Sequence, residues 1–474
     1  MSRRRIRVPR RRAYIVALGI IAMALGGLVL ARAPGRALRP APDPGSWAPN
    51  PGPGVLTLSG PSLSGQLAFD HGGLLAGRPQ TLSAELRLEG LGEISSRGPV
   101  ALAIVLDTSG SMAGEKIEQA RSAVVQMVRR MRADDQVALI TYDSGARELQ
   151  ALGPASHLQE QLWRVREIRA GGGTNIPAGL RLGSLALSAA PTHLVRRLVL
   201  VSDGIDGSGV PLQATQMELR ARAAEGTTVS ALGIGIDYSE PYLTTVADAG
   251  SGNYAFLARG AELEGFLRQE LDEAASTVID RLMATVSLPA GWQLDRAFGA
   301  QVQTRGNAID IPVGALIAGR SRSVILRLRV PASGAGMSAP LSASVRYRTV
   351  GDAEEHAIEA GGLQLAFLED PAAVEDTLNA PVFAQTEGAL IDARQAEALE
   401  AWRRGDQARA GALSQTNVQA LRDLHAVAPT GGVRSQLEAA EEEATNIQEM
   451  PAASPAAESY RRASGTSRRV RALY

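Results

Sequence analysis

The feature of the sequence that most limits its possible folds is a series of apolar runs between residues 99 and 277. The runs VALAIVL, QVALITY, RRLVLVS and TVSALGIG do not alternate with polar positions, which is typical of strands buried on both faces. Segments with helical spacing separate them. In residues 115–131, one helix face carries Ile117, Ala120, Val124, Val128 and Met131. Strand–helix alternation predicts an α/β domain over residues 99–277, a mostly parallel sheet wound on both faces by helices.

Stretches of strict alternation flank this α/β domain. In the β-rich segment 55–98, TLSAELRL places every second residue on one apolar face, and SVILRLRV and LSASVRY repeat the pattern within residues 278–369. We therefore predict a β-sandwich with one wet face per sheet, and the α/β domain inserted in its chain. Helical spacing returns over residues 370–450, where Gly405-Asp406 is expected to end one helix and begin the next. Residues 451–474 are polar and are predicted to be a flexible tail.

The N-terminus predicts a membrane anchor. An arginine-rich block within residues 1–33 precedes an apolar stretch from Ala13 to Ala31, whose helical length comes close to the ~30 Å of a bilayer core. The basic block is expected to stay in the cytoplasm, which would place the rest of the chain in the periplasm or at the cell surface as a single-pass protein. A cleaved signal peptide, giving a secreted protein, is the alternative. Residues 34–54 are rich in Pro and Gly and are predicted to be an extended linker.

The composition excludes several functions. The sequence has no cysteine, which rules out disulfides, thiolate catalysis and zinc–cysteine sites. Lys plus Arg and Asp plus Glu number 49 each and aromatic residues make up 4%, so we expect no nucleic-acid partner. The five histidines are scattered, and neither G-x-S-x-G nor H-E-x-x-H occurs. We therefore predict that the protein is not an enzyme.

Three short segments carry oxygen ligands at the ends of the predicted elements. Asp107, Ser109 and Ser111 follow the run VALAIVL with the spacing D-x-S-x-S. Thr174 follows three glycines, and Asp203 ends the run VLVSD. The carboxyl ends of parallel strands meet at one sheet edge, so the three loops are expected to converge. Hydroxyl and carboxylate oxygens suit a hard cation, and we predict a divalent site for Mg²⁺, with Mn²⁺ or Ca²⁺ as alternatives.

The charge of this ligand set indicates what it would do. Only two of the five ligands carry charge, and the hydroxyls fill coordination positions without neutralising the ion further. The small site leaves a position for an incoming Asp or Glu carboxylate of a protein partner. Each residue alone also suits a turn or a helix cap. D-x-S-x-S by itself is therefore weak, and the combination of the three segments favours the metal site.

Residues 99–277 resemble the von Willebrand factor A family, whose metal-ion-dependent adhesion site reads D-x-S-x-S, then Thr, then Asp. The segments DQVALI and Ser202-Asp203-Gly204 match as well. The flanking regions are more loosely similar to bacterial membrane-anchored relatives and to inter-α-trypsin-inhibitor heavy chains. The resemblance implies a Rossmann-like fold, a bound divalent cation and an adhesion or scaffold role. Two alternatives stay open: an envelope-complex module with a purely structural metal, and a less favoured metal-dependent hydrolase.

Overall fold

The structure is a computed structural model that describes residues 54–92, 98–203, 205–234, 240–257, 262–352, 354–427, 429 and 431–449. The predicted anchor within residues 1–33, the linker up to residue 53 and the tail 451–474 lie outside the described residues. Within the described ranges, no helix has both the length and the apolar character needed to cross a membrane.

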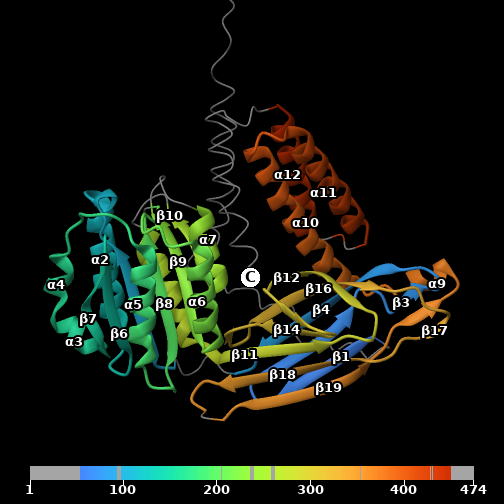
Figure 1. The fold of residues 1–474 in the computed structure, drawn as a ribbon, viewed down its shortest axis with the longest axis horizontal. Coiled ribbons are helices and arrows are strands. Elements are labelled where there is room, and N and C mark those ends of the chain that lie inside the picture. Colours follow the sequence, from blue (N-terminus) through green and yellow to red (C-terminus); the bar gives the residue numbers. More distant parts are fainter. Residues whose placement is uncertain are drawn as a thin grey trace, which may run out of the picture. The chain divides into compact units, whose positions relative to one another are not determined.

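A six-stranded sheet in the order β10-β9-β8-β5-β6-β7 forms the α/β part (Figure 1). β7 runs antiparallel to β6, and the other neighbours pair in parallel. The predicted doubly wound, mostly parallel sheet is therefore confirmed. Its strands are β5 (Val100–Asp107), β6 (Gln136–Tyr142), β7 (Ala146–Pro154), β8 (Val195–Ser202), β9 (Thr227–Ile234) and β10 (Ser251–Leu257).

Helices cover both faces of this sheet. On β5, Leu102 and Ile104 pack in the core formed with α2 and α8, whereas Ala103 and Val105 point into the core formed with α5 and α7. Burial on both faces explains why the strand sequences are apolar without alternation. The helices are α2 (Glu115–Arg130), α3 (Ala155–Glu160), α4 (Leu162–Arg166), α5 (Ile176–Ser188), α6 (Leu212–Ala224), α7 (Glu240–Ala249) and α8 (Leu263–Ala275).

Two antiparallel sheets enclose a second core, and both take part in a β-sandwich. β4 precedes the α/β part and pairs with β16, which follows it, so Leu82 lies opposite Leu328. One sheet is β1 (Val55–Gly60), β2 (Leu63–Phe69), β4 (Gln80–Gly90), β16 (Ser321–Val330) and β12 (Gln293–Phe298). The other is β13 (Gln303–Arg305), β14 (Ala308–Pro312), β11 (Thr277–Ser287), β18 (Leu341–Thr349) and β19 (His356–Leu363), with β15 (Leu316–Ile317) beside β11. β17 (Gly336–Met337), β20 (Ala366–Leu368) and β3 (Gly73–Leu75) form a small third sheet.

The prediction of one wet face per sheet is wrong for β4. Ser83 and Glu85 belong to the face opposite the sandwich core, yet only 6% and 5% of their surfaces are exposed. Helix α10 contacts β4 and so shields this face from water. Glu85 accepts a hydrogen bond of 2.5 Å from the hydroxyl of Ser323, and burial raises the pKa of its carboxyl group.

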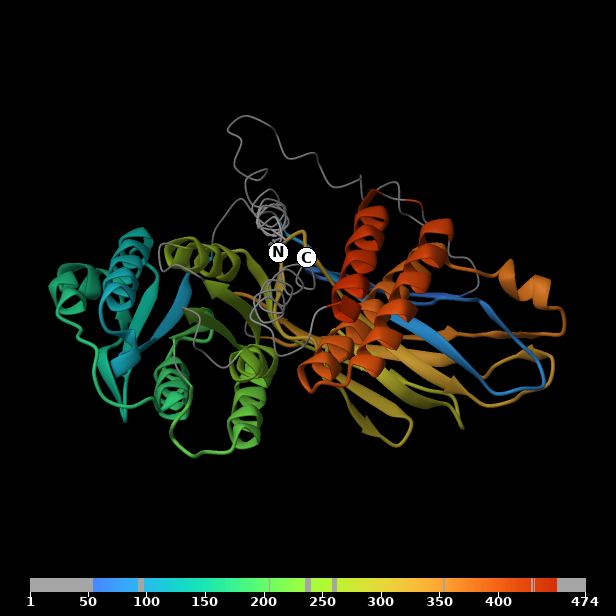
Figure 2. The ribbon, with the colours of Figure 1, turned by 90° about the horizontal axis from the view of Figure 1, so that it is seen from above.

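Helices dominate the C-terminal part, and α10, α11 and α12 lie side by side (Figure 2). Gly405 takes a positive φ of 83° after α10, and Asp406 accepts a hydrogen bond of 3.1 Å from the backbone of Arg409 in α11. The predicted stop and cap at Gly405-Asp406 are therefore confirmed. The helices are α9 (Pro371–Glu375), α10 (Ala380–Arg403), α11 (Gln407–Val427) and α12 (Gly431–Glu449).

Candidate metal centre

The predicted site lies where the strand order of the α/β sheet reverses. From β5 the chain continues to β6 and β7 on one side of the sheet, and β8 leads to β9 and β10 on the other. Such a switch point is where open α/β sheets bind ligands, at the carboxyl ends of the strands. Asp107 is the last residue of β5, and Asp203 directly follows the neighbouring β8.

Asp107 is fully buried, and hydrogen bonds fix the orientation of its carboxylate. Its Oδ1 accepts a bond of 2.8 Å from the backbone N–H of Ser109. Its Oδ2 accepts bonds of 2.7 Å from the Ser202 hydroxyl and 3.2 Å from the Tyr142 phenol. Burial raises the pKa of Asp107, and the nearby charge of Asp203 adds to the rise. The two acidic groups thus form a buried pair that favours a positive charge beside it.

The two serines of the motif connect Asp107 with Asp203. The hydroxyl oxygens of Ser109 and Ser111 are 3.0 Å apart, and the hydroxyl of Ser111 donates a bond of 2.8 Å to Oδ1 of Asp203. Buried Met112 anchors the short 3₁₀ helix, Gly110–Met112, that holds this loop. The structure therefore brings four of the five predicted residues into one hydrogen-bonded cluster.

Backbone contacts bring Thr174 to the same edge. The amide of Gly171 donates to the carbonyl of Thr108 at 2.8 Å, and the amide of Gly110 donates to the carbonyl of Gly172 at 3.1 Å. The carbonyl of Thr174 accepts a bond of 2.8 Å from Gly207, in the loop after Asp203. Its hydroxyl makes no hydrogen bond to another described residue, so the structure places the loop of Thr174 without joining its side chain to the cluster.

Asp206, which follows in the same loop, has a different role. Its carboxylate accepts bonds of 3.0 Å from the backbone N–H of Ile176 and 2.6 Å from the hydroxyl of Ser208. Asn175 also caps α5, through a bond of 3.1 Å from the amide of Ala178. These contacts order the start of α5 beside Thr174 and leave Asp206 as a loop residue.

Lys116 is a member of the cluster that the sequence reasoning missed. Its ammonium group contacts Oδ2 of Asp203 and donates a bond of 3.3 Å to the carbonyl of Ser111. The Asp203 side chain is completely buried, and Lys116 supplies a positive charge next to it. The signal in the sequence is simple, because Lys116 is the only lysine of the chain.

The donor set fits a hard divalent cation. It combines two carboxylates with serine and threonine hydroxyls, all of them oxygen ligands, and a cation already lies against Asp203. Across the ranges that the structure describes, His, Asp and Glu side chains form no group of three with metal-binding geometry. A metal here would therefore depend on the hydroxyls as well as on the carboxylates.

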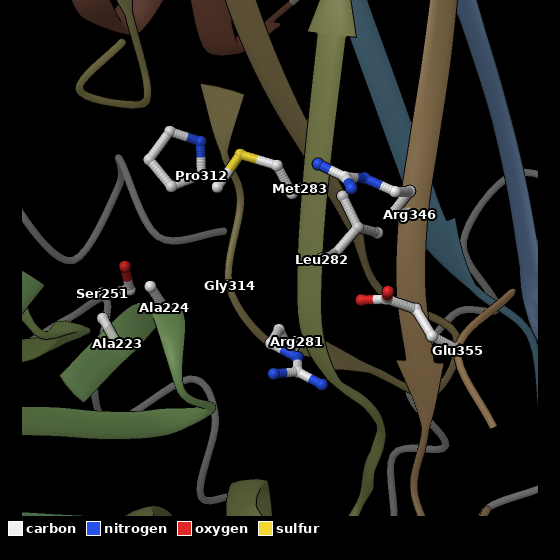
Figure 3. Close-up of a pocket in the computed structure, with 10 residues that line it drawn as sticks. All are labelled: Ala223, Ala224, Ser251, Arg281, Leu282, Met283, Pro312, Gly314, Arg346 and Glu355. Carbon is white, nitrogen blue, oxygen red and sulfur yellow. The ribbon is translucent and has the colours of Figure 1, made fainter. Parts of the chain in front are cut away.

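A pocket elsewhere in the molecule does not bring the predicted metal ligands together (Figure 3). It has a volume of about 220 Å³, and residues of α6, β11 and β18 line it, among them Ala224, Arg281 and Arg346. This volume is below the range of about 300–1,000 Å³ typical of small-molecule sites. None of the residues predicted for the metal site borders the pocket, and we assign no function to it.

Fold and cluster together define an α/β domain with an oxygen-lined site at its switch point. The family described as von Willebrand factor type A domain matches residues 101–269. The chain therefore carries a von Willebrand factor type A (VWA) domain, a class of module typical of protein interaction.

Solved structures share the fold over most of the described chain. A von Willebrand factor type A protein from Catenulispora acidiphila superposes with a TM-score of 0.65 at 18% identity, covering 82% of this chain and 90% of that one. The ArnB paralog VWA2 from Sulfolobus acidocaldarius gives a TM-score of 0.59 at 14% identity, covering 82% and 98%. Identities this low show a similar fold and nothing further.

Curated relatives match over shorter stretches. The uncharacterized protein YfbK of Escherichia coli is 29% identical over 196 residues, which are 40% of this chain and 34% of that protein. Inter-alpha-trypsin inhibitor heavy chain H4 of Sus scrofa is 29% identical over 157 residues, 32% of this chain and 17% of that protein. The chain thus spans about a third of the length of the first relative and about a sixth of the second. Similarity to an inter-alpha-trypsin inhibitor heavy chain is confirmed over these 157 residues, whereas the looser likeness of the flanking regions stays a prediction.

Proposed function

We propose that this protein binds a divalent cation at the cluster and, through the ion, an acidic residue of a protein partner. Mg²⁺ is the first candidate ion, with Mn²⁺ or Ca²⁺ as alternatives. The residues that would hold it are Asp107, Ser109, Ser111, Thr174 and Asp203. The observation that carries the proposal is the chain of contacts from Asp107 through Ser109 and Ser111 to Asp203, at the switch point of the sheet.

The charges of the site support a role in binding a carboxylate. The positive charges of a divalent ion and of Lys116 together exceed the negative charges of Asp107 and Asp203. The site with its ion bound would therefore attract an anion. A bound ion would act as a Lewis acid toward an incoming carboxylate oxygen. Among the described residues, the hydroxyls of Ser109 and Ser111 make no hydrogen bond to a histidine or to any carboxylate other than those of the cluster. We therefore propose binding rather than catalysis.

The setting of the domain is part of the proposal. We infer that residues 13–31 tether the protein to a membrane as a single-pass anchor and that the VWA domain faces outward. The support is the order of basic block, apolar stretch and Pro/Gly-rich linker in the sequence. An adhesion or scaffold role follows from an exposed interaction domain on a tether.

Titration and pull-down with Asp107→Ala test the proposal. Calorimetry should detect Mg²⁺ binding to the wild type and none to the variant, because the variant loses a ligand whose orientation three hydrogen bonds fix. In a pull-down from envelope extracts, a partner should be retained with Mg²⁺ and released by EDTA. Asp134→Ala, which removes an exposed carboxylate before β6, is the matched control and should behave as wild type.

The same experiment separates the alternatives. A thermal shift with Mg²⁺ but no metal-dependent partner would favour a purely structural metal. Partner binding that survives both EDTA and Asp107→Ala would exclude the metal-bridged interaction.

A further inference from the structure

The single lysine of the chain lies at the candidate metal centre. All other members of the Lys plus Arg total of 49 are arginines. An arginine at this position would present a wide planar fork, whereas a lysine presents a compact point charge on a flexible stem. The ammonium group of Lys116 therefore resembles a small cation more closely than the guanidinium group of any arginine in the sequence does.

Helix formation does not account for a lysine at this position. Lys116 is the second residue of α2, in the first turn, where the helix dipole disfavours positive charge. Glu115 and Glu118 share that turn and suit it electrostatically. The contact that compensates Lys116 is instead the carboxylate of Asp203, which lies 87 positions along the chain, directly after the neighbouring strand β8.

The contact is an ion pair with very unequal exposure. The Asp203 side chain has no exposed surface, whereas 32% of the Lys116 side chain is exposed. A buried carboxylate without a counter-charge is costly, and the ammonium group offsets that cost. Lys116 belongs to helix α2 and not to the sheet, and its side chain is partly open to solvent.

We propose that Lys116 is a built-in counter-ion that a divalent cation must displace from Asp203 in order to bind. This inference rests on the proposed metal site and adds a residue that sets its affinity. In the metal-free protein, Lys116 keeps Asp203 and the loop of Ser111 in place. A bound ion would take the place of the ammonium group beside Asp203, and Lys116 would then turn away from that carboxylate toward solvent. The apparent affinity for metal is then the intrinsic affinity reduced by the fraction of molecules in which Asp203 is free.

Titration of the full chain with Mg²⁺ and Mn²⁺ tests this competition. If Lys116 occupies Asp203 in about nine molecules of ten, Lys116→Met should bind the ions about tenfold more tightly than wild type. Lys116→Arg retains a positive charge beside Asp203 in a different geometry and should bind the ions less tightly than Lys116→Met. Thermal unfolding of each variant in EDTA establishes that it is folded before the affinities are compared.

A charge-matched control excludes a general electrostatic effect. Arg129→Met removes one positive charge from the exposed C-terminal turn of the same helix. At 1.5 Å per residue this position is about 20 Å from Lys116, beyond the screening length of about 8 Å at physiological salt. The metal affinity of this variant should equal that of the wild type.

The possible results distinguish this inference from the proposed function. Tighter binding by Lys116→Met, or binding by that variant alone, supports displacement. Equal or weaker binding by Lys116→Met, with a wild type that does bind, overturns the counter-ion role and leaves the metal site standing. If neither protein binds Mg²⁺ or Mn²⁺, both the inference and the metal-bridged function are wrong.

The single lysine also permits a direct observation of displacement. Reductive ¹³C-methylation labels only Lys116 and the α-amino group, the two kinds of primary amine in the sequence. The Lys116 methyl resonance should shift during Mg²⁺ titration, with the midpoint found by calorimetry, while the α-amino resonance stays unchanged. A Lys116 resonance that does not respond to a bound ion would contradict displacement.

Discussion

At the scale of single residues, the candidate site consists of a short motif and of partners that only the fold supplies. Ser109 and Ser111 were predictable from the D-x-S-x-S spacing because that spacing is local. Tyr142 could not be found in this way, because it reaches Asp107 through the parallel pairing of β5 with β6. Pairing register is a property of the folded sheet. Lys116 stands out in the composition as the only lysine, but its contact with Asp203 depends on the fold.

The phenol of Tyr142 should support the metal site through Asp107. Tyr142→Phe removes the 3.2 Å hydrogen bond to Oδ2 and leaves the ring in its buried place. Groups that orient a ligand in this way commonly change metal affinity by about 10–100-fold, so we expect binding at least about tenfold weaker. Calorimetric titration measures it. The direction is opposite to that expected for Lys116→Met, and an unchanged affinity would show that Ser202 and Ser109 suffice to hold Asp107.

Glu85 should make stability depend on pH. Burial raises its pKa above the ordinary 4.5, so the folded protein holds this proton more tightly than the unfolded chain. The free energy of unfolding therefore falls as the pH rises from about 4.5 through the raised value. Glu85→Gln should flatten this fall and be more stable than wild type at neutral pH. Urea unfolding across this pH range measures the effect, with Glu89→Gln on the same strand as control; an unchanged slope would contradict it.

At the scale of elements, a buried polar network ties α8 to three strands of the sheet. Arg197 of β8 donates to Glu270 of α8 at 2.6 Å, and Ser230 of β9 donates to the same oxygen at 2.7 Å. Asn253 of β10 donates to the other oxygen at 2.7 Å. The sequence predicted the alternation of strands and helices in this domain but not the network, because charged residues on strands and helices are usually exposed. The network fixes where α8 lies along the sheet.

Breaking this network should cost far more than a surface ion pair. Arg197→Met leaves the charge of Glu270 buried, since 4% of the Arg197 side chain and none of the Glu270 side chain is exposed. Removing one partner of a buried pair typically costs about 3–5 kcal/mol in the free energy of unfolding. Denaturant unfolding measures this loss. Arg196→Met, on the adjacent and less buried position of β8, should cost about 1 kcal/mol or less, and similar losses in both variants would rule out a special role of the network.

At the scale of the whole molecule, the chain interrupts one sandwich with another domain. The alternation in residues 55–98 and 278–369 predicted strands in both segments, and β4 and β16 indeed pair along ten positions from Ser321 to Val330. What the pattern could not show was the cover that α10 provides on the outer face of β4, because periodicity does not report which element packs against a face. The strands that complete the sandwich, β16 among them, therefore follow the α/β part in the chain.

Two fragments test this organisation. The fragment 99–276 keeps the whole six-stranded sheet and helices α2 to α8, so it should fold alone, unfold cooperatively and bind Mg²⁺ like the full chain. The longer fragment 53–276 adds β1, β2, β3 and β4 without β16 or the facing sheet. It exposes an unpaired strand edge together with Leu82, Leu86 and Leu88, which are buried in the complete protein, and should aggregate. Circular dichroism measures whether each fragment is folded, and size-exclusion chromatography measures whether it aggregates, with residues 53–449 as the reference. An unfolded 99–276 fragment would mean that the α/β part depends on the sandwich, for which the contact of Arg320 with Glu273 of α8 at 3.3 Å is the first candidate.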